Sequence, residues 1–339
     1  MHRTISAAIV AAFSIALFSG SALADFNDKK AITATVTGAT PTGYPRVMIE
    51  GLNAIVRDAY PDSAVSLKPN SPGGGVLAIA EKEADFTGTA TGTEIKLAID
   101  GQKPFDHSLK GKFSYAMQLY DTQFIHFLMT KSWADENGIK SFDDIARKKP
   151  KMRLAINRDD NPQTTIGGPY EMMKAHGFTY ADVEKWGGGY VLGNSSTGLD
   201  AIKDGKADVF MNARNLNDAL IKDVHSTRPL LWIDADPAKV EKAAAVFSNK
   251  MDMVAKGTYP FMEKAYPTIR MSVMLLAGAH VPDETVYKYV KAIAEHQDAV
   301  RKIGGSLSDF DATKMPTNSP KLPLHPGAAR YYKEKGWLK

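Results

Sequence analysis

The chain has 339 residues, of which 44% are hydrophobic, and this length allows more than one hydrophobic core. Its 42 Lys and Arg residues outnumber 38 Asp and Glu by only four and form no long basic run, which argues against a nucleic-acid partner and indicates a mild preference for anions. It contains no cysteine, which excludes disulfides and an acylated N-terminal cysteine.

Residues 1–24 have the pattern of a cleaved secretory signal peptide. Arg3 precedes an apolar run from Ile5 to Phe18, and Ala22-Leu23-Ala24 is a small-x-small cleavage site. The run is shorter than the ~20 residues that a membrane-spanning helix needs. We therefore expect a mature protein that lies free in the periplasm of a Gram-negative cell, with no direct membrane insertion after the signal is removed.

Strands and helices alternate after the signal peptide. The expected elements are, in order, a strand at 32–36, a helix at 46–58, a strand at 64–68, a helix at 75–82, a strand at 85–87 and a helix at 94–99. This alternation predicts a mostly parallel sheet flanked by helices.

The apolar stretch 113–130 predicts one or two buried strands, at 117–120 and 124–129, that carry the chain toward a second lobe. The elements expected beyond it are a strand at 153–157, a helix at 162–176, strands at 190–192, 230–233 and 273–277, and an amphipathic helix at 282–303. We expect one discontinuous lobe made of 25–119 and 225–339, and a second lobe made of 120–224.

Two segments of the chain resemble each other. Ala78-Ile79 is followed five residues later by Ala84-Asp85, and Ala201-Ile202 is followed five residues later by Ala207-Asp208. A turn that begins with Asn precedes each segment, at 70–74 and at 194–198. One strand-turn-helix-strand unit used twice is typical of a two-lobed protein with a cleft, although helices that lead into strands occur in any α/β protein.

Four turns that follow strands have the composition of a binding site, because ligands collect at the carboxyl ends of strands in an open α/β sheet. They are 37–43, 71–75, 87–93 and 157–165. The helix starts beyond them offer free N–H groups to an anion. Arg158 and Arg214 are candidates for a carboxylate clamp. The alternatives are helix capping for each turn and a surface salt bridge for each arginine.

Catalytic and cofactor motifs are absent from the sequence. The histidines lack metal-ligand spacing, there is no thiol nucleophile, and neither a Gly-x-Ser-x-Gly elbow nor a nucleotide-binding glycine motif occurs. Adjacent acids such as Asp159-Asp160 are more typical of helix caps than of acid/base pairs. We therefore expect no catalytic residues, no metal and no cofactor.

Several short motifs carry a resemblance to a known family. They are Thr37-Gly38 with Gly43-Tyr44-Pro45, Gly73-Gly74 with Ala84-Asp85-Phe86, Leu119-Tyr120, the helix after Thr164-Thr165, 204–208, and the tail 323–334 with the sequence PLHPGAARYYKE. Over nearly the whole mature chain these motifs resemble the TAXI-type solute receptors of tripartite ATP-independent periplasmic (TRAP) transporters. The resemblance implies a type II-like periplasmic-binding-protein fold: two lobes, each a mostly parallel sheet flanked by helices, and a C-terminal helical return.

The resemblance also implies a function and a site. A small organic anion, a carboxylate or dicarboxylate or an amino acid such as glutamate, would bind between the lobes and pass to an ion-gradient-driven permease, with no chemistry on the ligand. The residues implied to contact it are Thr40, Thr42, Gly43, Tyr44, Ser71, Gly73, Gly74, Thr89, Thr91, Tyr120, Asn157, Arg158, Gln163, Thr164, Thr165, Asn212, Arg214 and Asn215.

Alternatives stay open at the level of the sequence. Arg158 and Asp159 stand where the family usually has Gly-Ser-Gly, so Arg158 would favour a second carboxylate whereas Asp159 would favour a ligand amine. The same architecture serves receptors of ATP-driven importers of sulfonates or thiamine precursors. A secreted enzyme that processes an anion in the same cleft is a third interpretation.

Overall fold

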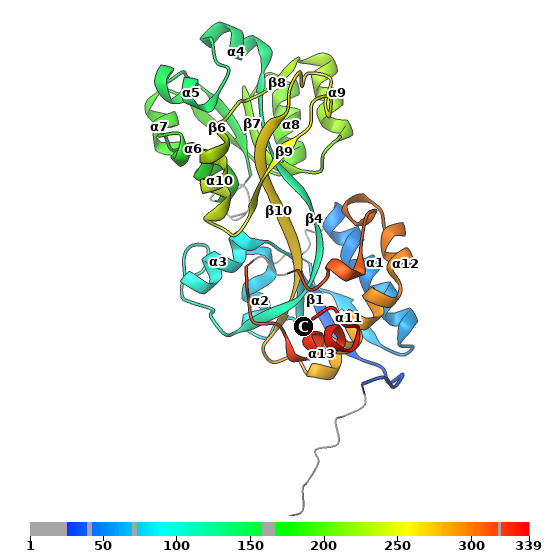
Figure 1. Cartoon of the computed structure of the whole chain (residues 1–339). Helices are drawn as coiled ribbons and strands as arrows, with labels where there is room; N and C mark the ends of the chain where they lie inside the picture. Colours follow the sequence, from blue (N-terminus) through cyan, green and yellow to red (C-terminus); the bar gives the residue numbers. More distant parts are fainter. Residues whose placement is uncertain (1–25, 39–42, 70–72, 158–166, 318–319, 339) are drawn as a thin grey trace, which may run out of the picture.

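The structure is a computed structural model that describes residues 26–38, 43–69, 73–157, 167–317 and 320–338. In this part of the chain, helices and strands form two α/β lobes joined by two long strands, as Figure 1 shows. The two-lobed α/β fold predicted from the sequence is thereby confirmed. The predicted signal peptide, 1–24, lies outside the described residues, and among those described no helix has the length and apolar character to cross a membrane.

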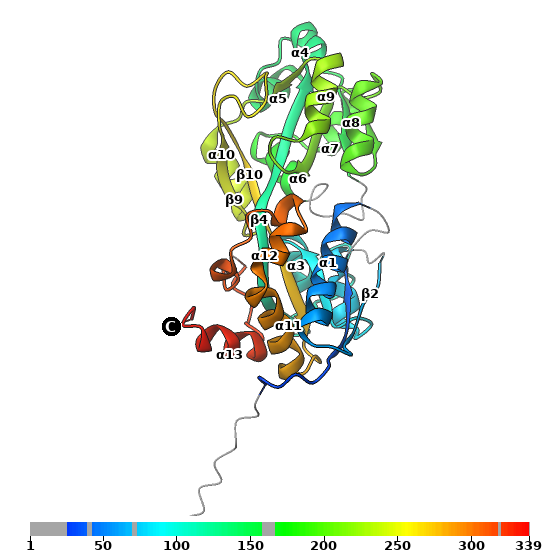
Figure 2. The same cartoon turned by 90° about the vertical axis from the view of Figure 1, so that its right-hand side faces the viewer.

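The first lobe combines the two ends of the described chain. Its N-terminal elements are β1 (Thr33–Thr37), α1 (Tyr44–Ala59), β2 (Ala64–Leu67), η1 (Gly73–Gly75), α2 (Val76–Ala80), β3 (Phe86–Ala90) and α3 (Gly92–Asp100). Its C-terminal elements are α11 (Asp283–Glu295), α12 (Gln297–Lys302), η3 (Gly305–Leu307), η4 (Ala312–Lys314) and α13 (Pro326–Glu334). Figure 2 shows α1 and α11–α13 in this lower lobe.

The second lobe is one continuous part of the sequence. Its elements are α4 (Lys131–Asn137), α5 (Phe142–Lys148), β5 (Arg153–Ile156), α6 (Gly168–Ala175), α7 (Tyr180–Lys185), β6 (Gly189–Leu192), α8 (Ser195–Lys203), β7 (Val209–Arg214), α9 (Ala219–Thr227), β8 (Leu230–Trp232), α10 (Pro237–Ala245) and β9 (Lys250–Val254). The strands β4 (Phe113–Thr130) and β10 (Tyr266–Gly278) belong to both lobes.

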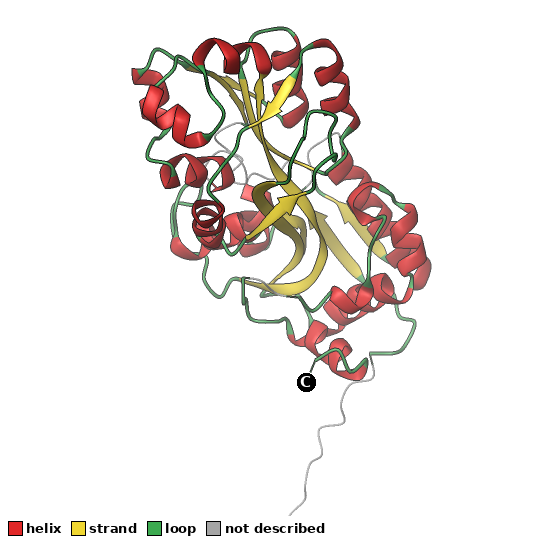
Figure 3. Cartoon of the chain, turned by 45° about the horizontal axis from the view of Figure 1, so that its top comes forward, coloured by secondary structure: helices red, strands yellow, loops and turns green. Residues whose placement is uncertain are grey.

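One curled sheet runs through both lobes, with helices on its two faces (Figure 3). The strand order is β2-β1-β3-β10-β4-β7-β5-β6, with β8 beside β4 and β9 beside β10. The pairs β1–β2, β1–β3, β5–β6 and β5–β7 are parallel, whereas β4 and β10 are antiparallel to each other. The parallel strands of each lobe thus lie on either side of an antiparallel crossing.

The crossing strand β4 is one uninterrupted strand, which decides between the one or two strands predicted for 113–130. Its pairing with β10 shifts register between Met271 and Met274, opposite residues 118–123. Such irregularities increase the local twist of a strand pair. The shift lies where the two strands pass from one lobe to the other.

Each lobe has a hydrophobic cluster on both faces of the sheet. In the first lobe, Leu52 of α1 packs on one face with α11, and Ile79 of α2 packs on the other with α3. In the second lobe, Val240 of α10 packs with α5 and α6, and Leu199 of α8 packs with α9 on the opposite face. The neighbouring strands β5 and β7 are largely buried, as expected for parallel strands with helices on both faces.

The predicted boundary at 224 is wrong with respect to this packing. Trp232 of β8 pairs with Leu128, Val240 lies in the core beside α6, and Ile269 of β10 lies in the same cluster. Residues 230–271 therefore contribute mainly to the second lobe rather than to the first. The long helix predicted at 282–303 is also interrupted, because His296 has φ −113° and ψ 37° and separates α11 from α12.

Candidate functional site

The repeated sequence unit has one structural role in both lobes. The Asp85 backbone N–H donates to Thr35 O at 2.8 Å, and the Asp85 carboxylate accepts from Thr35 N–H at 2.7 Å. Asp208 repeats both bonds with Arg153, at 2.8 and 3.0 Å. Each carboxylate thus fixes the register of the parallel strands whose carboxyl ends carry the predicted binding turns.

In the first lobe, two threonines hold two of the predicted turns together. The Thr87 hydroxyl donates to Gly74 O at 2.5 Å, and the Thr89 hydroxyl donates to Gly38 O at 2.8 Å. Gly38 has φ +100°, and a Cβ there would lie 2.3 Å from Thr89 Oγ1. Only glycine fits this backbone conformation and this close approach.

Thr91, one of the predicted ligand contacts, caps a helix in the structure. It caps α3: Thr91 N–H and hydroxyl donate to Glu94 Oε2 at 2.9 and 2.5 Å, and the same hydroxyl accepts from Thr93 N–H. Both Thr91 and Glu94 are buried. The next residue, Gly92, lies against the Phe247 carbonyl, where a Cβ would be 2.0 Å from the oxygen. The Thr91 hydroxyl thus donates and accepts its hydrogen bonds at the start of α3.

In the second lobe, two asparagines come together at the ends of β5 and β7. Asn212 Nδ2 donates to Asn157 Oδ1 at 2.7 Å, and both side chains are buried. Asn212 Oδ1 accepts from Ala213 N–H at 2.8 Å. The sequence placed these two residues in separate turns, and the parallel pairing of β5 with β7 brings them into contact.

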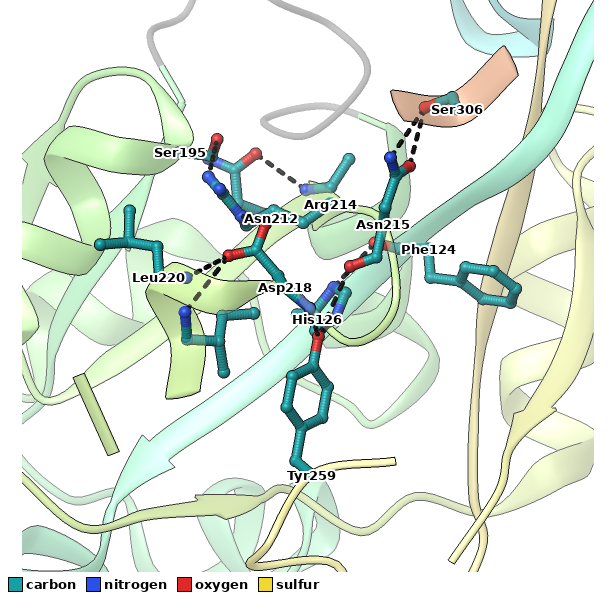
Figure 4. A network of polar contacts seen from close by, with 12 residues as sticks. Phe124, His126, Ser195, Asn212, Arg214, Asn215, Asp218, Leu220, Tyr259 and Ser306 are labelled. Atoms are coloured by element: carbon teal, nitrogen blue, oxygen red, sulfur yellow. Dashed lines mark hydrogen bonds and ion pairs between the residues drawn. The ribbon is translucent and has the colours of Figure 1, made fainter. Parts of the chain in front are cut away.

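Arg214 ends β7 and is held by two neighbours (Figure 4). Its Nε–H donates to Asp218 Oδ2 at 2.6 Å and its Nη1–H donates to Ser195 Oγ at 2.8 Å. The two charged side chains are only 16% and 15% exposed. Asp218 also accepts from the N–H groups of Leu220 and Ile221, so it caps α9 and orients the guanidinium at once.

A buried hydrogen-bonded pair, His126 and Tyr259, contacts the turn that follows β7. His126 Nδ1 lies 3.0 Å from Phe124 O, and His126 Nε2 lies 2.8 Å from the Tyr259 hydroxyl. Burial lowers the pKa of His126 to about 4, so the ring is neutral at pH 7. Its Nδ1–H then donates to the carbonyl, and Nε2 accepts from Tyr259. The same hydroxyl accepts from Asp218 N–H at 3.3 Å.

Three predicted site residues meet at Ser306, which the sequence analysis did not select. Asn215 Nδ2 donates to Ser306 Oγ at 2.8 Å, and Ser306 Oγ lies 3.0 Å from Asn215 Oδ1. Tyr44 OH donates to Gly304 O at 2.8 Å and accepts from Leu307 N–H at 3.1 Å. Burial raises the pKa of Tyr120, and a hydrogen bond with Ser306 opposes that rise.

The structure brings some of the predicted site residues together and does not describe others. Asn157, Asn212, Arg214 and Asn215 lie together in the second lobe, while Tyr44 and Tyr120 approach Asn215 through Ser306. Gly43 begins α1 with φ 89°, and Gly73 and Gly74 have φ of 60° and 63°. The residues Thr40, Thr42, Ser71, Arg158, Gln163, Thr164 and Thr165 lie outside the described residues.

The residues missed by sequence reasoning are Ser195, Asp218 and Ser306. Ser195 stands in the Asn194 turn that the repeat had singled out, and Asp218 has the position of an N-cap before an apolar helix, so both carried a detectable signal. Ser306 carried none beyond its Gly-Gly turn. In the part of the chain with described side chains, no group of three or more His, Asp or Glu residues is arranged to hold a metal.

Known structures share this fold. MatC from Rhodopseudomonas palustris with bound malate is 13% identical, with 90% of this chain and 97% of that chain covered and a TM-score of 0.50. The periplasmic binding protein BugD is 12% identical over 90% and 95% of the two chains, with a TM-score of 0.47. The binding component of a phosphonate ABC transporter from Pseudomonas aeruginosa is 10% identical over 82% and 80%, with a TM-score of 0.47.

The chain therefore shares the two-lobed α/β fold of MatC. A family model matches residues 37–336, which is most of the chain. The protein belongs to the NMT1-like family.

Proposed function

We propose that this protein is a periplasmic solute-binding protein that captures a small organic anion between its lobes and delivers it to a membrane permease. The observation that carries the proposal is the arrangement of Arg214, Asn212 and Asn215 at the end of β7, where the lobes meet. A guanidinium fixed in orientation and flanked by amides is suited to a carboxylate. The periplasmic location rests on the predicted signal peptide.

Asp218 defines how Arg214 would bind. Because Asp218 occupies Nε and Ser195 lies on Nη1, the Nη2 end of the guanidinium is the part with no partner among the described side chains. The internal ion pair also offsets much of the positive charge. Binding would then depend on hydrogen bonds in fixed directions more than on net charge, which suits a receptor that has to release its ligand.

The first test is a thermal-shift and calorimetric screen of the mature protein, unfolded and refolded to remove endogenous ligand. The panel contains mono- and dicarboxylates, amino acids, sulfonates and phosphate esters. Malate is included because MatC binds it in its solved structure. A ligand that binds only the folded state raises the melting temperature. We expect a rise confined to carboxylates. A rise confined to sulfonates or phosphate esters would contradict a carboxylate ligand, and no rise with any compound of the panel would contradict the proposed function.

Substitution of Arg214 tests the clamp. Arg214→Ala should weaken carboxylate binding by about tenfold or more, since a hydrogen bond to a charged group contributes roughly 1.5–3 kcal/mol. Arg147→Ala is the matched control, because Arg147 is exposed on α5 and pairs only with Asp144. Unchanged affinity in Arg214→Ala would exclude Arg214 as a ligand contact. The corresponding change at Arg158 tests whether a second carboxylate is recognised.

The partner that we propose is an ion-gradient-driven permease of the TRAP type, on the basis of the resemblance to TAXI receptors. An ATP-driven importer is the alternative. Uptake of the identified ligand into cells that carry the receptor and its neighbouring transport genes distinguishes the two partners. An ionophore should abolish uptake through an ion-gradient-driven permease. ATP depletion with an intact ion gradient should abolish uptake through an ATP-driven importer. Recovery of the ligand unchanged after long incubation would exclude an enzyme.

A further inference from the structure

Ser306 occupies a place where the two lobes touch through side chains. Asn215 follows β7 and belongs to the second lobe, whereas Ser306 lies in η3 of the first lobe, 91 residues further along the chain. The amide and the hydroxyl are in hydrogen-bonding distance through both amide atoms, at 2.8 and 3.0 Å. Figure 4 shows the pair beside Arg214 and Asp218.

The turn that carries Ser306 is fixed to the first lobe. Tyr44, the first residue of α1, bonds to Gly304 O and Leu307 N–H, so its hydroxyl spans the turn. Gly304 and Gly305 have φ of 80° and 57°, and a Cβ on Gly305 would lie 2.4 Å from the Tyr44 ring. The turn therefore follows the position of Tyr44 rather than moving independently of it.

We propose that Ser306 is a positioning residue that locks Asn215 to the first lobe, aligns Asn215 and Tyr44 for the ligand, and favours the arrangement in which the two lobes are in contact. Only the part of this inference that concerns ligand binding rests on the proposed function. A ligand binds more tightly when the competent arrangement is already populated. Loss of one or two neutral hydrogen bonds should therefore weaken binding modestly, by about three- to tenfold.

The first experiment measures lobe closure without any ligand. The natural chain has no cysteine, so Asp58→Cys on α1 and Asp200→Cys on α8, both exposed, allow one spin label on each lobe. Adding Ser306→Ala should shift the measured distance distribution toward longer values. Ser308→Ala is the matched control, because the exposed Ser308 hydroxyl donates to Gly305 O within the same turn. Identical distributions for the parent and Ser306→Ala would overturn the proposal.

Asn215→Ala provides the same test from the other lobe. It should reproduce the shift caused by Ser306→Ala, and the double variant should add little to either, because both changes break one contact. Melting temperatures show whether each variant is folded, and the Asn215 variant keeps the test valid if Ser306→Ala is not. If the distance shifts of the two single variants added fully in the double variant, a direct contact between Ser306 and Asn215 would not be what holds the lobes together.

The binding experiment uses whichever panel carboxylate raises the melting temperature of the parent. Ser306→Ala should weaken its binding three- to tenfold, Ser306→Thr should restore it because the hydroxyl remains, and Ser308→Ala should leave it unchanged. Weakening in Ser306→Ala without restoration in Ser306→Thr would contradict a role for the hydroxyl. If no panel compound binds, the proposed function fails. The distances between the spin labels without ligand still test whether Ser306 holds Asn215 to the first lobe.

Discussion

The carboxylates Asp85 and Asp208 show how single side chains set the strands that present the binding turns. Asp208 is 7% exposed and accepts from the Arg153 backbone and guanidinium. Asp208→Ala should lower the free energy of unfolding by about 1–3 kcal/mol, because the part-buried Arg153 N–H and the Arg153 guanidinium lose their acceptor. Asp204→Ala, at an exposed ion pair with Lys206, should stay within about 0.5 kcal/mol. Urea unfolding of both variants measures the difference, and equal losses would contradict the assigned role.

His126 predicts a pH dependence of stability. Burial lowers its folded pKa from 6.5 to about 4, so the unfolded chain binds a proton between these values while the folded chain does not. Stability from this residue is complete above pH 6.5 and is lost as the pH falls toward 4, by about 3 kcal/mol at most. His126→Gln should flatten the unfolding free energy over this range relative to the parent. The exposed His107→Gln should leave the slope unchanged.

The sequence could predict single residues only where local chemistry marked them. Arg214 and Asn212 stand in the polar segment 212–215, at the end of β7, and both lie in the candidate site. Ser306 was missed because its role depends on a contact with Asn215 across 91 residues, which no local pattern encodes. Thr91 was selected for its hydroxyl, yet the Glu three residues later was the signature of a capping box, and the cap is what the structure shows.

The turn between β1 and α1 depends on glycine in a way that substitution can test. Gly38→Ala would place a Cβ 2.3 Å from Thr89 Oγ1 at φ +100°, whereas Gly111→Ala has φ +77° and no atom within 4 Å. Gly111→Ala should cost about 1–2 kcal/mol for its backbone conformation alone. Gly38→Ala should cost more and also weaken ligand binding. Similar unfolding free energies for the two variants would show that Thr89 yields without penalty.

Elements were predictable where the periodicity of the sequence was strong. The helix expected at 46–58 is α1, and the strand expected at 64–68 is β2. The interruption at His296 was not predictable, because the apolar positions keep helical spacing on both sides of it. Residues 234–265 gave no clear alternation, so nothing in the sequence said which lobe α10 and β9 would cover.

The revised lobe boundary predicts which fragment folds. A fragment of residues 121–271 keeps β8, α10, β9 and the outer halves of β4 and β10, and should show a cooperative urea transition by circular dichroism. A fragment of residues 120–224, the lobe expected from the sequence, lacks Trp232, Val240 and Ile269 of the two clusters and should not. A cooperative transition in the shorter fragment would instead support the boundary at 224 that was predicted from the sequence.

The second lobe is inserted into the first between two neighbouring antiparallel strands, and this arrangement imposes an order on folding. During synthesis, every segment of the second lobe is present before the inner half of β10 and helices α11 to α13 emerge. The first lobe needs β10 between β3 and β4 to complete its sheet. Domains tend to fold as units once their chain is available. The lobe that contains the N-terminus is therefore the last to fold, because the free edge of β3 gains its partner only when β10 has been made.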